Sequence, residues 1–246
     1  MEVHHHPQVE KKSFKEYLLE GLMIFLAVSM GFIAENIREN IADREKAEVY
    51  MKSLISDIKD DHNFLVKYHQ LYIVKLPLLD SLIIQLNEPA ISINTNNLYY
   101  YARLASKSDG YPVNTRTIDQ MKNSGSFRVI KNENVSVGIV AYYALTEQVK
   151  LYESIEQQEE NEYRKIAVQI FNAVIFNEIN STLRVQRPVN NPALRTNDKK
   201  ILGDLSGWAH YIKNTRIGID YYKSELIKKG DSLTSLIQKE YHLEKE

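Results

Sequence analysis

The sequence predicts an all-α protein in which an N-terminal transmembrane helix continues into a long helix, followed by an antiparallel helical bundle. Two observations predict this class. The chain of 246 residues contains only nine Gly and six Pro, too few for the turn-dense pattern of β-sandwiches and barrels. Its apolar residues recur at steps of three and four over long stretches, which is the period of an amphipathic helix. The length suits one large or two small domains.

A transmembrane helix is predicted at residues 17–34. From Gly21 to Ala34 the chain carries no charge, and Tyr17 and two leucines extend the apolar stretch across Glu20. About 18 residues make roughly 27 Å of helix, which just reaches the thickness of a bilayer core. Apolar side chains cover every face of this helix, whereas an interfacial helix keeps a polar face. The residues taken to mark the membrane span are Tyr17, Leu22, Phe25, Met30 and Ala34.

Two alternatives to a lipid anchor stay open. A buried core helix can be equally apolar, and a run of fourteen uncharged residues is within that range. A cleaved signal peptide would also place an apolar region after the basic residues at 11–15, but Phe32 and Ala34 make a poor cleavage site. Residues 13–16, with the pattern Ser-Phe-Lys-Glu, form a capping box that begins a helix. An uncleaved anchor is therefore the preferred interpretation.

The span divides the chain into a short N-terminal tail (1–16), the membrane helix (17–34) and a helical water-facing domain (35–246). Equal numbers of basic residues flank the span, and those that precede it lie closer, which favours an N-terminus inside the cell. In a bacterium the chain would then be a single-pass inner-membrane protein with a periplasmic C-terminal domain.

The helix that contains the span is predicted to leave the bilayer and run to about Leu76. Pro77 has no N–H donor and disfavours helical geometry at the residue before it, so a kink or break is expected there. A second helical stretch, 78–86, then ends before Pro89.

Two short helices are predicted, one between loops at 89–97 and 106–114 and one after the second of these loops. Asn97 is expected to cap the first. The second begins with capping-box spacing at 117–120, and Gly125 is placed to end it in a left-handed conformation.

Two long amphipathic stripes, at 135–174 and 205–237, complete the pattern. The first is one helix or two helices joined near Gln157. The longest loop, 183–199, separates the two stripes. Long antiparallel helices joined by such loops imply a bundle.

Charge and cysteine content exclude several classes of function. The 31 basic and 32 acidic residues nearly cancel, and the basic ones are scattered, so no binding to nucleic acid is expected. The chain has no cysteine, which excludes disulfide frameworks, thiolate nucleophiles and Cys-ligated zinc. The compartment stays open on this evidence.

No catalytic, cofactor-binding or metal site is predicted, and the chain is not expected to be an enzyme. Residues 230–233 spell Gly-Asp-Ser-Leu, the tetrapeptide of a family of serine esterases, but they fall in a helical stripe and only thirteen residues follow them. No glycine-rich phosphate loop, nucleophile elbow or Rossmann fingerprint is present.

Histidines and one glutamate are the remaining candidate functional residues. The tract His4, His5, His6 could bind a divalent metal, although a disordered tail explains it better. His62 and His69 share one helix face, which a solvated surface explains at least as well. 

Glu20 lies about one turn inside the predicted boundary of the span. An ionisable side chain there is a candidate intramembrane functional residue, because such groups mark proton or ion coupling. The simpler interpretation is that its carboxylate reaches the lipid headgroups.

Two blocks of sequence carry a family resemblance. The first is MEVHHHPQVEKKSFKEYLLEGLMIFLAVSMGFIAENIRE, followed by YMKSLISDIKDD. The second is TIDQMKNSGSFRVIKNENVSVGIVAYY. Both resemble an uncharacterised bacterial family of short single-pass membrane proteins, whose members have a similar His-containing tail, span and following acidic helix. The resemblance implies a location in the cell envelope and adds no chemistry.

Together these observations predict a membrane-anchored helical protein that acts by protein–protein interaction, scaffolding or self-association in the cell envelope, without catalysis. The alternative is a periplasmic ligand-binding or sensory module that holds a small molecule between its helices and signals through a partner protein. A third hypothesis is ion-coupled work through Glu20.

Overall fold

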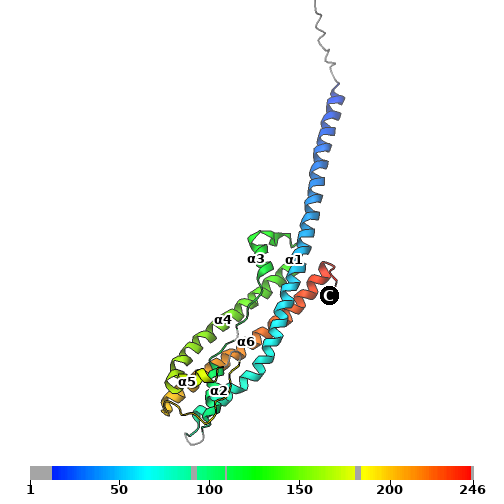
Figure 1. The fold of residues 1–246 in the computed structure, drawn as a ribbon. Helices are drawn as coiled ribbons and strands as arrows, with labels where there is room; N and C mark the ends of the chain where they lie inside the picture. The colour runs from blue at the N-terminus through cyan, green and yellow to red at the C-terminus, as the bar shows by residue number, and fades with distance from the viewer. Residues whose placement is uncertain (1–12, 90–92, 109, 181–183, 245–246) are drawn as a thin grey trace, which may run out of the picture. The chain divides into compact units, whose positions relative to one another are not determined.

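The computed structural model describes residues 13–89, 93–108, 110–180 and 184–244. In these ranges the regular elements are helices, and the one β contact is an isolated bridge between Asn180 and Val185. The predicted all-α class is confirmed. The elements are α1 (Phe14–Asn87), α2 (Thr95–Ala105), α3 (Arg116–Asn123), the 3₁₀ helix η2 (Ser126–Val129), α4 (Glu133–Ile170), α5 (Ala173–Glu178) and α6 (Lys199–Glu240) (Figure 1).

The chain forms two compact units, residues 1–50 and 51–246. In the first unit, the described residues after Ser13 all belong to α1. The rest of α1 and all the other helices belong to the second unit. The predicted long N-terminal helix is therefore present, and it contributes to both units.

The start of α1 agrees with the predicted capping box. The Glu16 carboxylate accepts a hydrogen bond of 2.6 Å from the backbone N–H of Ser13. Amide groups at a helix start have no partner inside the helix, so this bond satisfies a donor that would otherwise need water.

The predicted break at Pro77 does not occur, because α1 continues through it to Asn87, and the alternative of a kink there stays a prediction. Proline removes the hydrogen bond that its N–H would donate to the carbonyl four residues earlier, at Ile73. Both Ile73 and Pro77 are exposed, so water can satisfy this carbonyl. Tyr72 and Leu79 are buried on either side, and their packing holds the helix together across the proline.

One hydrophobic core cluster of the second unit lies where α1, α2, α4 and α6 meet. Fully burying one large apolar side chain stabilises a fold by about 1.5–3 kcal/mol, so this cluster contributes strongly to the unit's stability. Its buried members are Leu79, Leu82, Leu86, Leu98, Tyr99, Ala102, Ala105, Tyr163, Ala167, Ile170, Phe171, Ile179, Leu202, Leu205, Ala209 and Ile212.

The helices α4 and α6 pack side by side in the second unit (Figure 1). Glu153 of α4 lies 2.8 Å from Lys223 of α6, and Glu156 lies 2.5 Å from Arg216. Positions that rise along α4 therefore contact positions that fall along α6.

Two predicted helix starts are corrected. The cap of α2 is Asn94, whose side chain accepts a hydrogen bond of 3.2 Å from the N–H of Asn97, so Asn97 lies in the first turn. The capping box at 117–120 does not form, because the N–H of Thr117 donates to the Asp57 carboxylate of α1 at 2.9 Å.

Three other predictions are settled by the helix bounds. Gly125 has a φ of 64° two residues after the end of α3, as predicted for a left-handed residue there. The stripe around Gln157 is one helix, α4, which ends at Ile170, and α5 follows it as a separate short helix. The last helix, α6, begins at Lys199, six residues before the predicted stripe.

Candidate functional site

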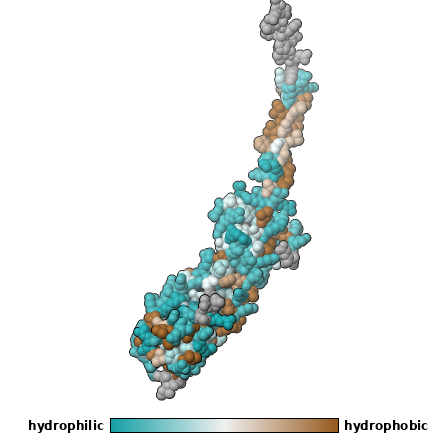
Figure 2. Space-filling model, viewed as in Figure 1, coloured by the Kyte–Doolittle hydropathy of each residue, from teal (hydrophilic) through white to brown (hydrophobic). Residues whose placement is uncertain are grey.

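The apolar segment of α1 has no protein cover among the described residues. One window of 18 residues in this helix is long and apolar enough to cross a membrane, and none of it is buried. Phe25 is 65% exposed and Met30 is 63% exposed, and Figure 2 shows the hydrophobic surface as a band on this helix. A core helix would be buried, so that alternative does not fit the structure. Exposed apolar surface of this extent marks an interaction with lipid or protein.

The residues predicted to mark the span all lie on α1 within the first unit. Tyr17, Leu22, Phe25, Met30 and Ala34 are exposed.

Glu20 lies on the exposed surface of α1, one turn inside the predicted boundary of the span, and its proposed ion-coupling role stays a prediction. His4, His5 and His6 lie outside the described residues. Within the described ranges, no group of three or more His, Asp or Glu side chains is placed to hold a metal ion.

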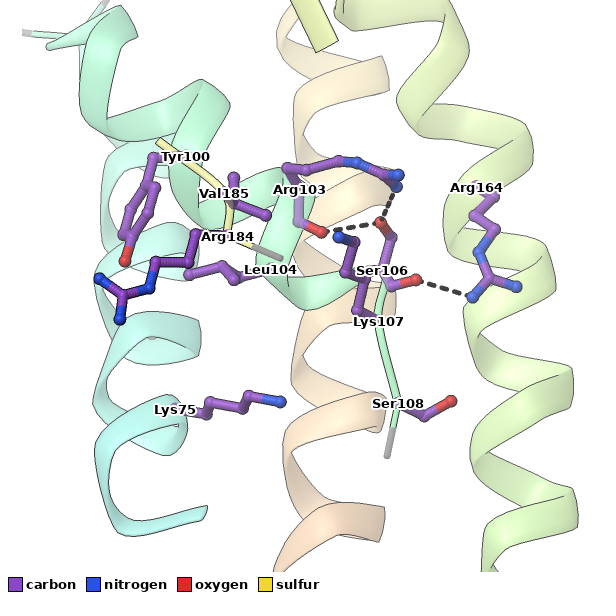
Figure 3. A pocket seen from close by; sticks show the side chains of 10 residues that line it. All are labelled: Lys75, Tyr100, Arg103, Leu104, Ser106, Lys107, Ser108, Arg164, Arg184 and Val185. Atoms are coloured by element: carbon purple, nitrogen blue, oxygen red, sulfur yellow. Dashed lines mark hydrogen bonds between the residues drawn. The ribbon is translucent and has the colours of Figure 1, made fainter. Parts of the chain in front are cut away.

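A basic cavity of about 760 Å³ lies in the second unit (Figure 3). This volume is in the range of small-molecule binding sites. Half of the described lining residues are basic and none of them is acidic. The basic ones are Lys75, Arg103, Lys107, Arg164 and Arg184, and the others are Tyr100, Leu104, Ser106, Ser108 and Val185.

Two arginines of the basic cavity are held in place by the segment that follows α2. Arg164 Nη2 donates hydrogen bonds to the Ser106 carbonyl at 2.7 Å and to the Glu160 carboxylate at 2.6 Å. Arg103 Nη1 donates to Ser106 Oγ at 3.2 Å, and Figure 3 shows both guanidinium groups turned toward Ser106. Arg103 Nε is buried without an acceptor among the described residues. The cavity wall is therefore partly fixed before any ligand binds.

Arg216 of α6 is buried behind this segment, with 5% of the residue exposed. Its guanidinium contacts Glu156 at 2.5 Å and Glu160 at 3.0 Å, and it donates to the carbonyls of Ala105 and Lys107, each at 3.1 Å. Burial alone would lower the pKa of Arg216, but the two carboxylates raise it above its ordinary value. One side chain thus joins α6 and α4 to the end of α2.

A second buried cation, Lys223, lies further along α6. Lys223 is 1% exposed, and its Nζ is 2.8 Å from the Glu153 carboxylate and 3.5 Å from the centre of the Tyr68 ring. The ring faces attract a cation, and Glu153 supplies the opposite charge. The same carboxylate accepts a hydrogen bond from the N–H of Tyr111 at 3.0 Å. These contacts hold the Lys223 side chain in place, and the Glu153 carboxylate balances its positive charge.

Two buried aspartates of α1 hold the chain that leads into α3. Asp57 accepts the Thr117 N–H, while Asp61 accepts the Asn114 N–H at 3.0 Å and the Tyr142 hydroxyl at 2.9 Å. Burial raises the pKa of Asp61 above its ordinary value, and its hydrogen bonds oppose this shift. Their spacing of four residues within an apolar stripe is a signal that sequence reasoning missed.

The raised pKa of Asp61 has a testable consequence for stability. A carboxyl group with a raised folded-state pKa contributes stability below the unfolded pKa, about 4, and loses it as the pH rises through the folded pKa. The difference in unfolding free energy between the natural protein and the Asp61→Asn variant is therefore expected to fall as the pH rises above 4. Urea titrations from about pH 4 upward measure it. A difference that is constant or rises contradicts the assignment.

The two histidines that share a face of α1 point to α6. His62 lies 2.9 Å from Asp231, and His69 lies 2.8 Å from Asp220. Gly230 packs so tightly that an added Cβ would lie 3.0 Å from a side chain of α1. The esterase-like tetrapeptide is therefore part of a contact between helices, and the histidines are interhelical partners rather than a purely solvated face.

No protein-family model, curated protein or solved structure matches this chain. Two features stand out from the geometry: the uncovered apolar segment of α1 and the basic cavity. The first was predicted from local sequence. The second was missed, because its basic residues come from positions as far apart as 75 and 184, and no local pattern joins them.

Proposed function

We propose that residues 17–34 anchor this protein in a membrane, and that the helical water-facing domain acts without catalysis by binding another envelope protein or a second copy of itself. The observation that carries the proposal is the apolar window of α1, of which no part is buried. Lipid offers such a helix an apolar surrounding on all sides, and its backbone hydrogen bonds are already made within the helix.

The proposed arrangement of the water-facing domain is an antiparallel bundle. The reversed order of contacts between α4 and α6 supports it, and so does the packing of α1, where His62 and His69 contact Asp231 and Asp220. In the proposed topology the N-terminus is cytoplasmic and the domain lies in the periplasm of a bacterium.

Fractionation and labelling test the anchor and its orientation. The protein is expected to stay in the membrane pellet after alkaline washing and to need detergent for release. Since the chain has no cysteine, a Lys200→Cys variant gives a single thiol at a side chain that is 85% exposed. An impermeant maleimide should label it in intact cells.

Permeabilised cells are the matched control, because they expose the same thiol in either orientation. Labelling that appears only after permeabilisation places the domain in the cytoplasm and contradicts the proposed topology. Full-length protein that remains soluble without detergent contradicts the anchor.

The partner is tested by purification in mild detergent. The expected particle is larger than one chain of 28.6 kDa with its detergent, as either a homo-oligomer or a complex. Recovery only as a monomer contradicts binding to a partner or to itself.

A second candidate function, capture of a small ligand, is favoured by the basic cavity. A ligand that binds only the folded state stabilises it by mass action. No partner or anchor is needed for this property, so it can be measured independently of the first proposal.

A further inference from the structure

The charge of the basic cavity constrains what can bind there. Its lining brings together Lys75 of α1, Arg103 of α2, Lys107 of the segment after α2, Arg164 of α4 and Arg184, and no described lining residue is acidic. Gathering like charges costs free energy. A bound anion would offset that cost, whereas a cation or an apolar molecule would not.

We propose that this cavity binds a small phosphate-bearing ligand, an inference that rests on the ligand-capture function above. Guanidinium groups present paired N–H donors that match phosphate oxygens, and lysines add compact charges. Three arginines and two lysines suit a ligand that carries more than one negative charge. The Ser106 and Ser108 hydroxyls already donate to the Arg103 carbonyl and the Glu160 carboxylate, so the basic side chains are the donors for a ligand.

One carboxylate, Glu160, contacts Arg164 of the cavity lining. Glu160 is shared between Arg164 and Arg216, with distances of 2.6 and 3.0 Å, so one negative charge serves two guanidinium groups. Its side chain is 1% exposed. Arg164 Nη2 donates to Glu160 and to the Ser106 carbonyl, and Nη1 donates to Asn161 at 3.1 Å. The Nε and the second N–H of Nη1 are the donors of Arg164 that a ligand can meet.

The donors on the cavity wall are arranged before binding. The Ser106 hydroxyl accepts a hydrogen bond from Arg103, and the Ser106 carbonyl accepts one from Arg164. Arg216 donates to the neighbouring carbonyls of Ala105 and Lys107. Fixed donors lose little conformational freedom on binding, which raises affinity. The buried Arg103 Nε, without an acceptor among the described residues, adds to the positive field there.

The phosphate could belong to a free small molecule or to a lipid headgroup. Both present the same charged oxygens to the basic cavity. Inorganic pyrophosphate represents the free source, and a short-chain phosphatidic acid represents the headgroup.

Calorimetric titration of the full chain in uncharged detergent tests the proposal. Pyrophosphate or short-chain phosphatidic acid is expected to bind with one site per chain, more weakly as salt is added. The Lys75→Gln/Arg184→Gln variant is expected to raise the Kd by about tenfold or more, because each charge-assisted contact contributes strongly. The tighter probe identifies the source.

The matched control removes two positive charges elsewhere. Lys165→Gln/Lys200→Gln changes side chains that are 69% and 85% exposed and outside the basic cavity, and it should change the Kd by less than about twofold. Unfolding midpoints of all variants verify that they are folded.

Equal weakening by the control variant would show non-specific charge attraction and overturn the proposal, as would the absence of binding by both probes. If a neutral compound stabilises the chain while neither phosphate probe binds, the ligand class is wrong but ligand capture stands. Anchoring is decided by fractionation and does not depend on either result.

Discussion

Replacing Arg216 with alanine is expected to lower the free energy of unfolding of the helical domain by about 3–5 kcal/mol. The substitution leaves Glu156 buried without its cation and Glu160 paired with Arg164 alone, at side-chain exposures of 4% and 1%. It also removes the donor to the carbonyls of Ala105 and Lys107. Urea unfolding followed by circular dichroism measures the loss.

Two variants make this result specific to the buried charge network. Lys228→Ala removes a lysine that is 72% exposed and paired with Glu225, and its unfolding midpoint should match that of the natural protein. Arg216→Met combined with Glu156→Gln should lose less stability than Arg216→Ala, because Glu160 keeps its contact with Arg164 and no buried charge is left unpaired. An Arg216→Ala midpoint equal to that of Lys228→Ala contradicts the role of the network.

Placing two aspartates in the apolar segment is expected to release the protein from the membrane. An aspartate at the centre of a membrane helix costs about 2.5–3.5 kcal/mol on insertion, so Phe25→Asp/Met30→Asp costs about 5–7 kcal/mol if the two add. Inserted protein would then be a minor fraction. The alkaline-wash pellet measures the change.

The control uses the same chemistry further along the same helix. Ile73→Asp/Val74→Asp alters apolar side chains that are 57% and 66% exposed on α1, outside the proposed span. This variant should remain in the pellet. Retention of Phe25→Asp/Met30→Asp after alkaline washing contradicts a lipid-embedded segment.

Features with a local cause were predicted well. The capping pattern at 13–16 and the left-handed Gly125 both depend on neighbouring residues, and the structure has both. Long helices follow from apolar spacing for the same reason, because the period reports which face of each helix is buried.

Predictions failed where a distant part of the chain changes the local preference. Pro77 continues a helix because buried residues on either side hold it, and Thr117 is capped by Asp57, sixty residues earlier, instead of by its own helix.

The sequence by itself determined the helical class, the apolar segment at 17–34 and the absence of known catalytic motifs, because each depends only on residues that are close together in the sequence. Only the tertiary structure decided that Arg216 joins three helices and that five cations from separate segments line one cavity. The physical reason is that periodicity specifies which face of a helix is buried. Which residues of another helix meet that face is decided by packing between elements.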